Sequence, residues 1–398
     1  MANKNGGFIG TDGLDAPDPP TAVTPTAANA QVSVAFTAPT DTGTSAITAF
    51  VATTNDGFGA TGSSSPLTIT SLTNGTNYTV RVSAINAYGT SAPSEASDSF
   101  TPIAQTGLFA GGIRTGSSTT QQIDTITITS TGNATDFGDL TVTTRYGGGS
   151  LGSSTRGVFV AGSGGTANII DYVEFATAGN ATDFGDVTAE FSIENASTSN
   201  NTRGVTALGT TGSDSNVIEY ITIANTGNGT DFGDLTVARR ALSAGASSSG
   251  RAFFAGGQNS GTNNDTIDYI AIASTGNASD FGNLTVAREA LAGCASATRG
   301  LMGGGVSPSA LVNVIDYITI GSTGNASDFG DLSAAKQRPG AASSLVRGVF
   351  AGGESSSAVV NVMEYVTIGS TGNVTDFGDL PVAKYYFSGC SNCHGGIS

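Results

Sequence analysis

The sequence predicts an all-β protein in which an N-terminal β-sandwich precedes a C-terminal six-bladed β-propeller. Two observations of composition support this fold class: 57 of the 398 residues are glycine, and the 38% that are hydrophobic are mostly small or β-branched. Only 12% of the residues are charged, whereas disordered chains usually carry high charge and few β-branched residues. In addition, no stretch keeps the 3.6-residue hydrophobic period of a long helix.

Short alternating strands mark the first hundred residues. The runs QVSVAFTAP, AITAFVATT, PLTITSL and NYTVRVSAINAYG occupy residues 31–39, 46–54, 66–72 and 77–89. Strands of this length between turn-rich segments predict a β-sandwich. Pro17, Pro19 and Pro20 set an extended entry to it. We therefore expect residues 1–16 to form an N-terminal anchor segment and residues 17–103 to form the sandwich.

The segment SLTNGTNYTVRVSAINAYGTSAPS, residues 71–94, resembles the fibronectin type III family. Leu72 and Tyr78 match the tyrosine-corner region of that family, and AINAYGTSAPS matches its last hairpin. Phe36 stands where the family usually has a buried tryptophan. The resemblance covers about residues 17–103; it implies the fold and says little about function.

One phrase recurs six times after residue 104. Its first copy reads TGNATDFGDL, and its glycine lies at residues 132, 179, 227, 276, 324 and 372, in steps of 47, 48, 49, 48 and 48. A regular period rich in glycine and β-branched residues is typical of a propeller with one four-stranded blade per repeat. Residues 104–398 are therefore expected to form six blades.

Each repeat divides into strands and turns. In one copy, RAFFAGG (251–257) and DTIDYIAIA (265–273) predict strands, STGNASDFGNL (274–284) predicts a turn, and TVAREALAGCAS (285–296) predicts a strand that leads into the next blade. The strand that ends in Gly-Gly, the aromatic strand after it and the later basic residue resemble the kelch repeat. Phe281 and its five equivalents lie about where that family places a tryptophan.

The shared phrase has a structural interpretation and two others. Gly and Asn tolerate positive φ, and Asn, Ser, Thr and Asp close turns onto their own backbone. Each copy also holds a glycosylation sequon, whose use would need a secretory route: Asn133, Asn180, Asn228, Asn277, Asn325 and Asn373. Paired carboxylates such as Asp136 and Asp139 are candidate Ca²⁺ ligands, although they lack the ligand density of a known calcium loop.

The segment after each Gly-Gly varies among the repeats while the turns stay constant. Such loops cluster on one face of a propeller and usually carry binding. The candidate ligand-binding residues are Arg114, Gln121, Asn168, Asp214, Asn216, Asn259, Asn263, Asn264 and Glu354.

The last residues, CSNCHGGIS, fit the C-x-x-C-H pattern of haem attachment, and Cys390, Cys393 and His394 are candidate metal ligands. Aligned by the period of the repeat, however, these positions take small or polar residues in sister copies, so we interpret the tail as strand-and-turn structure. The strand expected before the first strand that ends in Gly-Gly is missing, and the last copy of that preceding strand has no successor. We therefore expect residues 385–394 to pair with residues 107–112 and close the ring. The residues involved are Tyr386, Phe387, Cys390, Leu108 and Phe109.

Composition excludes several classes of function. The formal net charge of −16 argues against binding to nucleic acid or to an anionic membrane, because both need a basic patch. No apolar run of about 18 residues is present, so we expect no membrane insertion. His394 is the only histidine, and 17 of the 31 acidic residues recur at structural positions of the repeat, so no catalytic set stands out. We expect no enzymatic activity and no cofactor.

The pairing of the two modules, with the opening MANKN, resembles virion proteins of tailed bacteriophages, which form tail fibres, spikes or capsid decorations. The N-terminus lacks the apolar core of a signal peptide, which agrees with synthesis in a host cytoplasm and localisation in the virion. We expect a homo-oligomer whose N-terminal segment contacts other virion proteins and whose propeller contacts a host-surface glycan or protein. A capsid decoration protein, a bacterial surface carbohydrate-binding protein and a hydrolase are the alternatives.

Overall fold

The computed structural model describes residues 15–142, 145–163, 168–189, 194–210, 212–246 and 250–397. The chain divides into two compact units, residues 1–105 and residues 106–398. Over the described ranges the regular structure is β-strand, apart from a short 3₁₀ helix, η1 (Gly395–Ile397). No helix in those ranges is long and apolar enough to cross a membrane.

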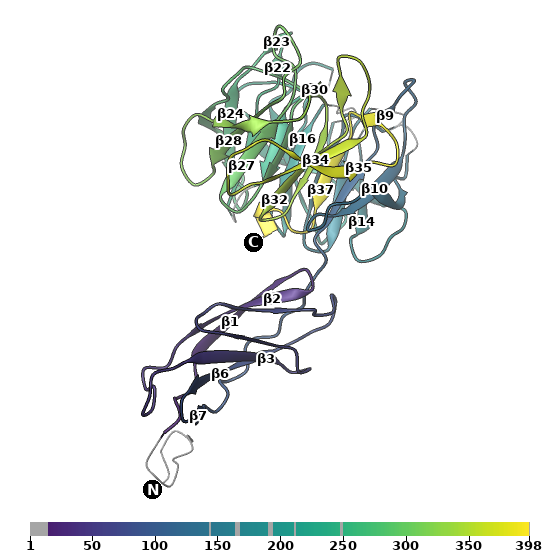
Figure 1. The fold of residues 1–398 in the computed structure, drawn as a ribbon. Coiled ribbons are helices and arrows are strands. Elements are labelled where there is room, and N and C mark those ends of the chain that lie inside the picture. The colour runs from purple at the N-terminus through teal and green to yellow at the C-terminus, as the bar shows by residue number, and fades with distance from the viewer. Residues whose placement is uncertain are drawn as a thin grey trace. The chain divides into compact units, whose positions relative to one another are not determined.

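Two antiparallel sheets form the first unit (Figure 1). One has the order β1-β2-β5 and consists of β1 (Thr21–Ala28), β2 (Gln31–Thr37) and β5 (Leu67–Thr70). The other has the order β4-β3-β6-β7 and consists of β4 (Gly59–Gly62), β3 (Ala49–Thr54), β6 (Val80–Asn86) and β7 (Gly89–Thr90). Alternate residues of β2 and β6 are buried in the shared core, as the period of two in the sequence predicts.

Details predicted for the sandwich are present in the first unit. The hydroxyl of buried Tyr78 accepts a hydrogen bond from the backbone N–H of Thr73 at 3.1 Å, which is the bond of a tyrosine corner. Phe36 is buried, and its ring centroid lies 4.8 Å from that of Phe50. Residues 1–14 of the predicted anchor lie outside the described residues. Asp15 belongs to the sandwich, because its carbonyl oxygen accepts a hydrogen bond from Asn86 Nδ2 at 2.9 Å.

Six four-stranded antiparallel sheets form most of the described part of the second unit. From the innermost strand outward they are β37 (Ser388–Ser391), β8 (Thr106–Ala110), β10 (Gln122–Thr127) and β11 (Thr135–Asp139); β12 (Gly149–Gly152), β13 (Arg156–Val160), β14 (Ile169–Glu174) and β15 (Thr182–Asp186); β16 (Ala196–Ser199), β17 (Arg203–Ala207), β18 (Val217–Thr222) and β19 (Thr230–Asp234); β20 (Ser243–Ala246), β21 (Arg251–Ala255), β24 (Thr266–Ala271) and β25 (Ser279–Asn283); β26 (Ala292–Ala295), β27 (Arg299–Gly303), β28 (Val314–Thr319) and β29 (Ser327–Asp331); and β31 (Gly340–Ser343), β32 (Arg347–Ala351), β34 (Val362–Thr367) and β35 (Thr375–Asp379).

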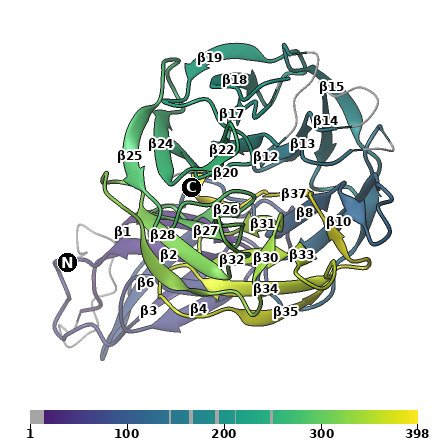
Figure 2. The same ribbon diagram turned by 90° about the horizontal axis from the view of Figure 1, so that it is seen from above.

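The innermost strands surround a central axis, as Figure 2 shows from above. Contacts run in turn from β12 through β16, β20, β26 and β31 to β37, and β37 contacts β12. Short two-stranded sheets gather at one end of this axis, which we call the mouth end (Figure 1). They pair β22 (Gln258–Asn259) with β23 (Thr262–Asn263), β30 (Lys336–Gln337) with β33 (Glu354–Ser355), and β36 (Lys384–Tyr385) with β9 (Ile113–Arg114). We call the opposite end, where the chain terminates, the tail end.

The C-terminal strand completes the first sheet. β37 pairs with β8 so that Cys390 lies opposite Leu108 and Gly389 lies opposite Phe109. The rings of Phe109 and Phe387 meet edge to face at 5.9 Å. The inner strands begin a few residues later than the sequence predicts, because the preceding residues, such as Tyr386 at φ 63°, leave the extended conformation.

The second half of the shared phrase is a strand, and the prediction of a turn there is wrong. In β25, Asp280 pairs with Asp268, and a bulge shifts the register at Gly282. Gly282 has φ 146°, and a Cβ there would overlap the carbonyl oxygen of Gly324 in the next copy of the phrase. Glycine is therefore required here because the next sheet packs closely against it, and not because the chain turns.

The asparagine of the phrase ties each sheet to the next. Asn277 Oδ1 accepts the backbone N–H of Asp234 from the preceding sheet at 3.1 Å, and the other copies do the same. Asn133 accepts the N–H of Asp379 at 3.0 Å and so joins the last sheet to the first. The phrase therefore has the structural role of a clamp between sheets. Glycosylation of the sequons stays a prediction. No group of three or more His, Cys, Asp or Glu in the described ranges is placed to hold a metal ion.

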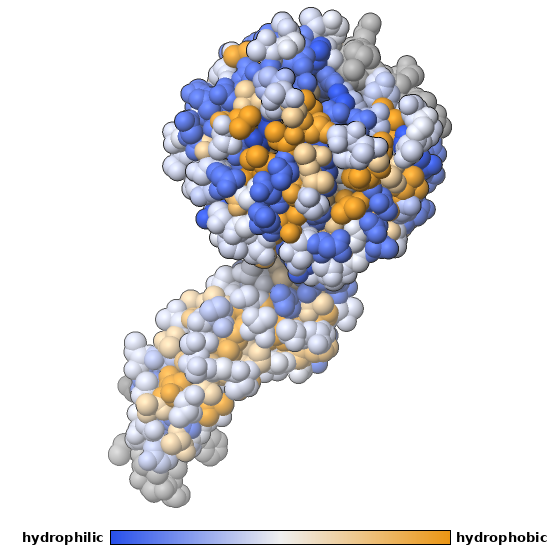
Figure 3. Space-filling view, turned by 45° about the horizontal axis from the view of Figure 1, so that its top comes forward, coloured by the Kyte–Doolittle hydropathy of each residue, from blue (hydrophilic) through white to orange (hydrophobic). Residues whose placement is uncertain are grey.

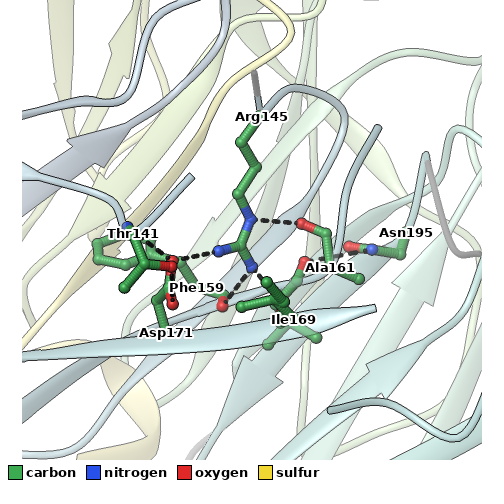
Figure 4. A network of polar contacts seen from close by, with 8 residues as sticks. Thr141, Arg145, Phe159, Ala161, Ile169, Asp171 and Asn195 are labelled. Atoms are coloured by element: carbon green, nitrogen blue, oxygen red, sulfur yellow. Dashed lines mark hydrogen bonds and ion pairs between the residues drawn. The ribbon is translucent and has the colours of Figure 1, made fainter. Parts of the chain in front are cut away.

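The basic residue after the phrase makes a buried ion pair in the described sheets. Figure 4 shows Arg145, whose Nη1 lies 2.6 Å from Asp171 Oδ2 and whose other nitrogens donate to three backbone carbonyl oxygens. Burial lowers the pKa of Arg145 to about 10, and Asp171 opposes that shift. Equivalent pairs join Arg239 to Asp268, Arg288 to Asp316, Lys336 to Glu364 and Lys384 to Asp124.

Candidate functional site

Six residues, one from each repeat, form a closed ring of backbone hydrogen bonds around the mouth end of the axis. Each N–H donates to the carbonyl oxygen of the residue before it in the ring, at 2.7–3.1 Å, and Gly147 donates to Tyr386 to complete the circle. All six have left-handed φ values between 52° and 66°. The ring consists of Gly147, Glu194, Ala241, Ala290, Arg338 and Tyr386.

Three members of this ring have large side chains, whereas the other three are glycine or alanine. Gly147, Ala241 and Ala290 present little or no side chain, whereas Glu, Arg and Tyr occupy the other positions. A left-handed backbone costs about 1–3 kcal/mol for a residue other than glycine, so the backbone gives no reason for large side chains here. We infer that the three are present for what their side chains do at the mouth.

These side chains belong to a polar group that we call the axial cluster: Glu194, Asp214, Arg240, Arg338, Glu354 and Tyr386. Glu194 is its centre. The Tyr386 hydroxyl donates a hydrogen bond to Glu194 Oε1, and Arg240 Nε lies 3.2 Å from Oε2. The pKa of Glu194 is raised because burial disfavours its charged form, while Arg338 and Arg240 oppose that rise.

Arg240 and Arg338 differ in how firmly they are held. Arg240 also lies 3.3 Å from Asp214 Oδ1 and donates to Gln258 Oε1 at 2.9 Å. Arg338 stacks over the Tyr386 ring, 4.3 Å from its centroid, and its closest carboxylate oxygens are 3.9 and 4.0 Å away. Tyr146 packs edge-on against Tyr386 at 5.6 Å. The cluster thus combines hydrogen-bond donors, acceptors and aromatic surface.

A cavity of about 80 Å³ opens at this cluster, lined by Glu194, Arg338 and Tyr386 among others. A second cavity, of about 100 Å³, lies along the inner strands and is lined by Ser150, Ser197 and Ser243. The axis is therefore hollow and polar below the ring of backbone hydrogen bonds.

The C-terminal tail closes the other end of the axis. His394 is buried, with Nε2 3.1 Å from the carbonyl oxygen of Gly152 and Nδ1 accepting the N–H of Gly396 at 3.1 Å. Burial lowers the pKa of His394 to about 4 and raises those of Cys390 and Cys393 to about 12. Neutral thiols and an imidazole bonded to backbone are typical of packing groups rather than of ligands.

Two of the residues singled out in the variable loops, Asp214 and Glu354, lie in the axial cluster. The others contact nearby backbone or side chains, and their role as ligand contacts stays a prediction. Arg114 donates to Thr120 and Gln122. The remaining contacts are Asn259 to Ala238, Asn263 to Val306, Thr266 to Asn264, and the N–H groups of Leu140, Val187 and Leu235 to the carbonyl oxygens of Gln121, Asn168 and Asn216.

Sequence reasoning missed Glu194, Arg240 and Arg338, and it assigned Tyr386 only to ring closure. A signal existed: when the repeats are aligned, one position reads Gly, Glu, Ala, Ala, Arg and Tyr. This position lies just before the inner strand and outside the variable loops that follow Gly-Gly.

Residues 15–100 match the family model of the fibronectin type III domain, and this stretch of the chain forms such a domain. The matched residues cover the β-sandwich that the sequence predicts and that the first unit forms. No curated protein matches the chain.

Proposed function

We propose that this chain is a structural protein of a tailed-bacteriophage virion, exposed as a tail fibre or spike component. In this proposal the second unit is a kelch-like six-bladed β-propeller whose mouth recognises the host surface. The fibronectin type III domain acts as a spacer, and the N-terminal segment contacts other virion proteins.

The contacts between sheets support the propeller. The innermost strands contact one another in a closed circuit. Two hydrogen bonds join the last sheet to the first: the N–H of Tyr386 donates to the carbonyl oxygen of Arg338 near the axis, and the N–H of Asp379 donates to Asn133 near the rim. A propeller has radially arranged four-stranded sheets around a central channel. An imaging reconstruction with six-fold pseudosymmetry would test this architecture directly.

The axial cluster carries the proposal of recognition. Three of its residues, Glu194, Arg338 and Tyr386, depart from the repeat in a strained backbone conformation and line a cavity. The chain enters the second unit at Thr106, whose N–H donates to Asn392 Oδ1 at the tail end, so the mouth lies at the end away from the connection. Figure 3 shows hydrophobic and hydrophilic residues mixed over the visible face of the second unit.

Purified virions test the location. We expect mass spectrometry to detect the chain and electron microscopy to place it on the tail; a position on the capsid would favour the decoration alternative, and absence from virions would contradict the proposal. A bacterial surface carbohydrate-binding protein would instead be found on uninfected cells.

Competition with phage adsorption tests recognition. The full chain added in excess is expected to block adsorption, and Glu194→Ala is expected to abolish the block. Ala241 and Ala290 occupy the same backbone conformation in sister repeats, so this variant is expected to fold. Asp98→Asn, an exposed change in the fibronectin type III domain, serves as the control. Blocking by Glu194→Ala at full strength would show that the mouth is not the contact.

A further inference from the structure

A buried carboxylate recurs at one position of each sheet in the second unit, and in five sheets it pairs with a basic side chain. The pairs, at 2.6–3.1 Å, are Arg145 with Asp171, Arg239 with Asp268, Arg288 with Asp316, Lys336 with Glu364 and Lys384 with Asp124. In the third sheet the position is Glu219, which is only 2% exposed and makes no ion pair among the described residues.

The missing base is visible in the sequence. Each base lies two residues before a member of the ring of backbone hydrogen bonds, as Arg145 lies before Gly147. Two residues before Glu194 the sequence has Ser192, and the run TAEFSI that leads to Glu194 contains neither lysine nor arginine. Residues 190–193 lie outside the described ranges, but their composition alone shows that they cannot supply a base.

The contacts of Glu219 are those of a negative charge. The N–H of Thr188 lies 3.1 Å from both carboxylate oxygens, and its hydroxyl also donates to Oε1. The ion-paired carboxylates accept the same two bonds, as Asp316 does from Thr285. Burying a negative charge without a positive partner is strongly unfavourable, and a neutral water molecule does not supply the missing charge.

The other sheets show where a positive charge lies. In four of them the base also donates to the backbone carbonyl oxygen of the residue that pairs with the carboxylate across the sheet. Lys384 Nζ, for example, is 2.8 Å from Asp124 Oδ2 and 3.2 Å from the carbonyl oxygen of Phe109. The residue that pairs with Glu219 is Thr206. The Glu219 carboxylate and the Thr206 carbonyl oxygen therefore correspond to the two groups that hold the ammonium of Lys384.

A second departure from the repeat coincides with the missing base. The residue after the asparagine of the shared phrase is alanine or valine in five copies and Gly229 in the copy of the third sheet. A Cβ at Gly229 would overlap Oε2 of Glu219. Loss of the base alone would not require glycine here, so the two changes together form a separate kind of site around Glu219.

We propose that Glu219 and the carbonyl oxygen of Thr206 bind a monovalent cation of about the size of an ammonium group, such as potassium, where the other sheets use a basic side chain. Carboxylate and carbonyl oxygens are ligands for such hard cations. One carboxylate balances one positive charge, which matches the one-to-one pairs of the other sheets. The ion neutralises the boundary between the second and third sheets, and this role is independent of the proposed recognition at the mouth.

Urea unfolding of the full chain in potassium chloride and in tetramethylammonium chloride, at equal ionic strength, tests the inference because tetramethylammonium is too bulky for a buried site. We expect potassium to lower the unfolding equilibrium constant of the second unit about tenfold at ten times the dissociation constant of the ion. Glu219→Gln keeps the shape without the charge and is expected to lose this response. Gly229→Ala adds the methyl group that sister repeats carry and is expected to raise the potassium concentration needed. Asp280→Asn, an exposed change in the same unit, serves as the control and should respond like the parent chain.

The comparison of the two salts on the parent chain needs no variant to fold. Equal stability of the parent chain in both salts would overturn the inference. A potassium response that Glu219→Gln retains in full would show that the ion acts elsewhere and would also overturn it. Stabilisation by calcium chloride but not by potassium chloride would contradict a monovalent site.

Discussion

The buried imidazole of His394 makes the stability of the second unit depend on pH. Nδ1 accepts the N–H of Gly396, which leaves the proton on Nε2, where it is donated to the carbonyl oxygen of Gly152. A second proton would have to displace the Gly396 bond, and no carboxylate of the described residues hydrogen-bonds to the imidazole. The folded chain therefore binds that proton only near pH 4, whereas the unfolded chain binds it near 6.5.

This difference sets both the sign and the size of the effect. Because the folded-state pKa is the lower one, the contribution to stability is fully present above about pH 6.5 and is lost as the pH falls toward 4. The interval of about 2.5 pH units between the two values corresponds to roughly 3 kcal/mol in the free energy of unfolding. Titrating carboxylates add their own acid dependence, so the imidazole is isolated by comparison with His394→Gln, which cannot titrate.

Urea unfolding at pH 7 and pH 4.5 measures this contribution. We expect the parent chain to lose about 2–3 kcal/mol more than His394→Gln over this interval. Because His394 is the only histidine, its imidazole signal in a nuclear magnetic resonance titration also reports one site alone. Equal acid losses in the two proteins, or an imidazole that titrates near pH 6.5 while the chain is folded, would refute the reasoning.

Three further predictions concern the architecture of the second unit. Deleting residues 385–398 removes the innermost strand of the first sheet, so we expect loss of the cooperative melt of this unit; a truncated chain that still melts cooperatively would contradict it. Arg288→Met should cost about 3–5 kcal/mol by chemical denaturation because Asp316 stays buried and unpaired, while adding Asp316→Leu should recover most of the loss. Asn133→Ala, which breaks the bond from Asp379, should lower stability by about 1 kcal/mol; an unchanged denaturation midpoint would show that this clamp contributes nothing.

Local patterns made much of the fold predictable. Alternation of hydrophobic residues and the Tyr78 corner identify the sandwich, because strand burial and a side-chain bond to a nearby backbone group depend on residues close in sequence. The recurring phrase showed where each repeat lies along the chain. The error lay in the phrase itself, where a bulge at Gly282 and its equivalents keeps a glycine-rich segment in a strand. Glycine has the same signature in a turn and in close packing, and only the neighbouring sheet distinguishes the two.

The sequence by itself determined the sandwich, the repeats and the need for a returning C-terminal strand, because each depends on periodicity or on a count of strands. Only the tertiary structure decided where the polar side chains of the axial cluster gather. Glu194, Arg338 and Tyr386 are far apart in the chain, and the residues next to each of them in sequence do not mark it as part of a site. They meet because the inner strands start around one axis and a ring of backbone hydrogen bonds holds their α-carbons together. Distances between repeats depend on how the sheets pack, and the local sequence carries no record of that.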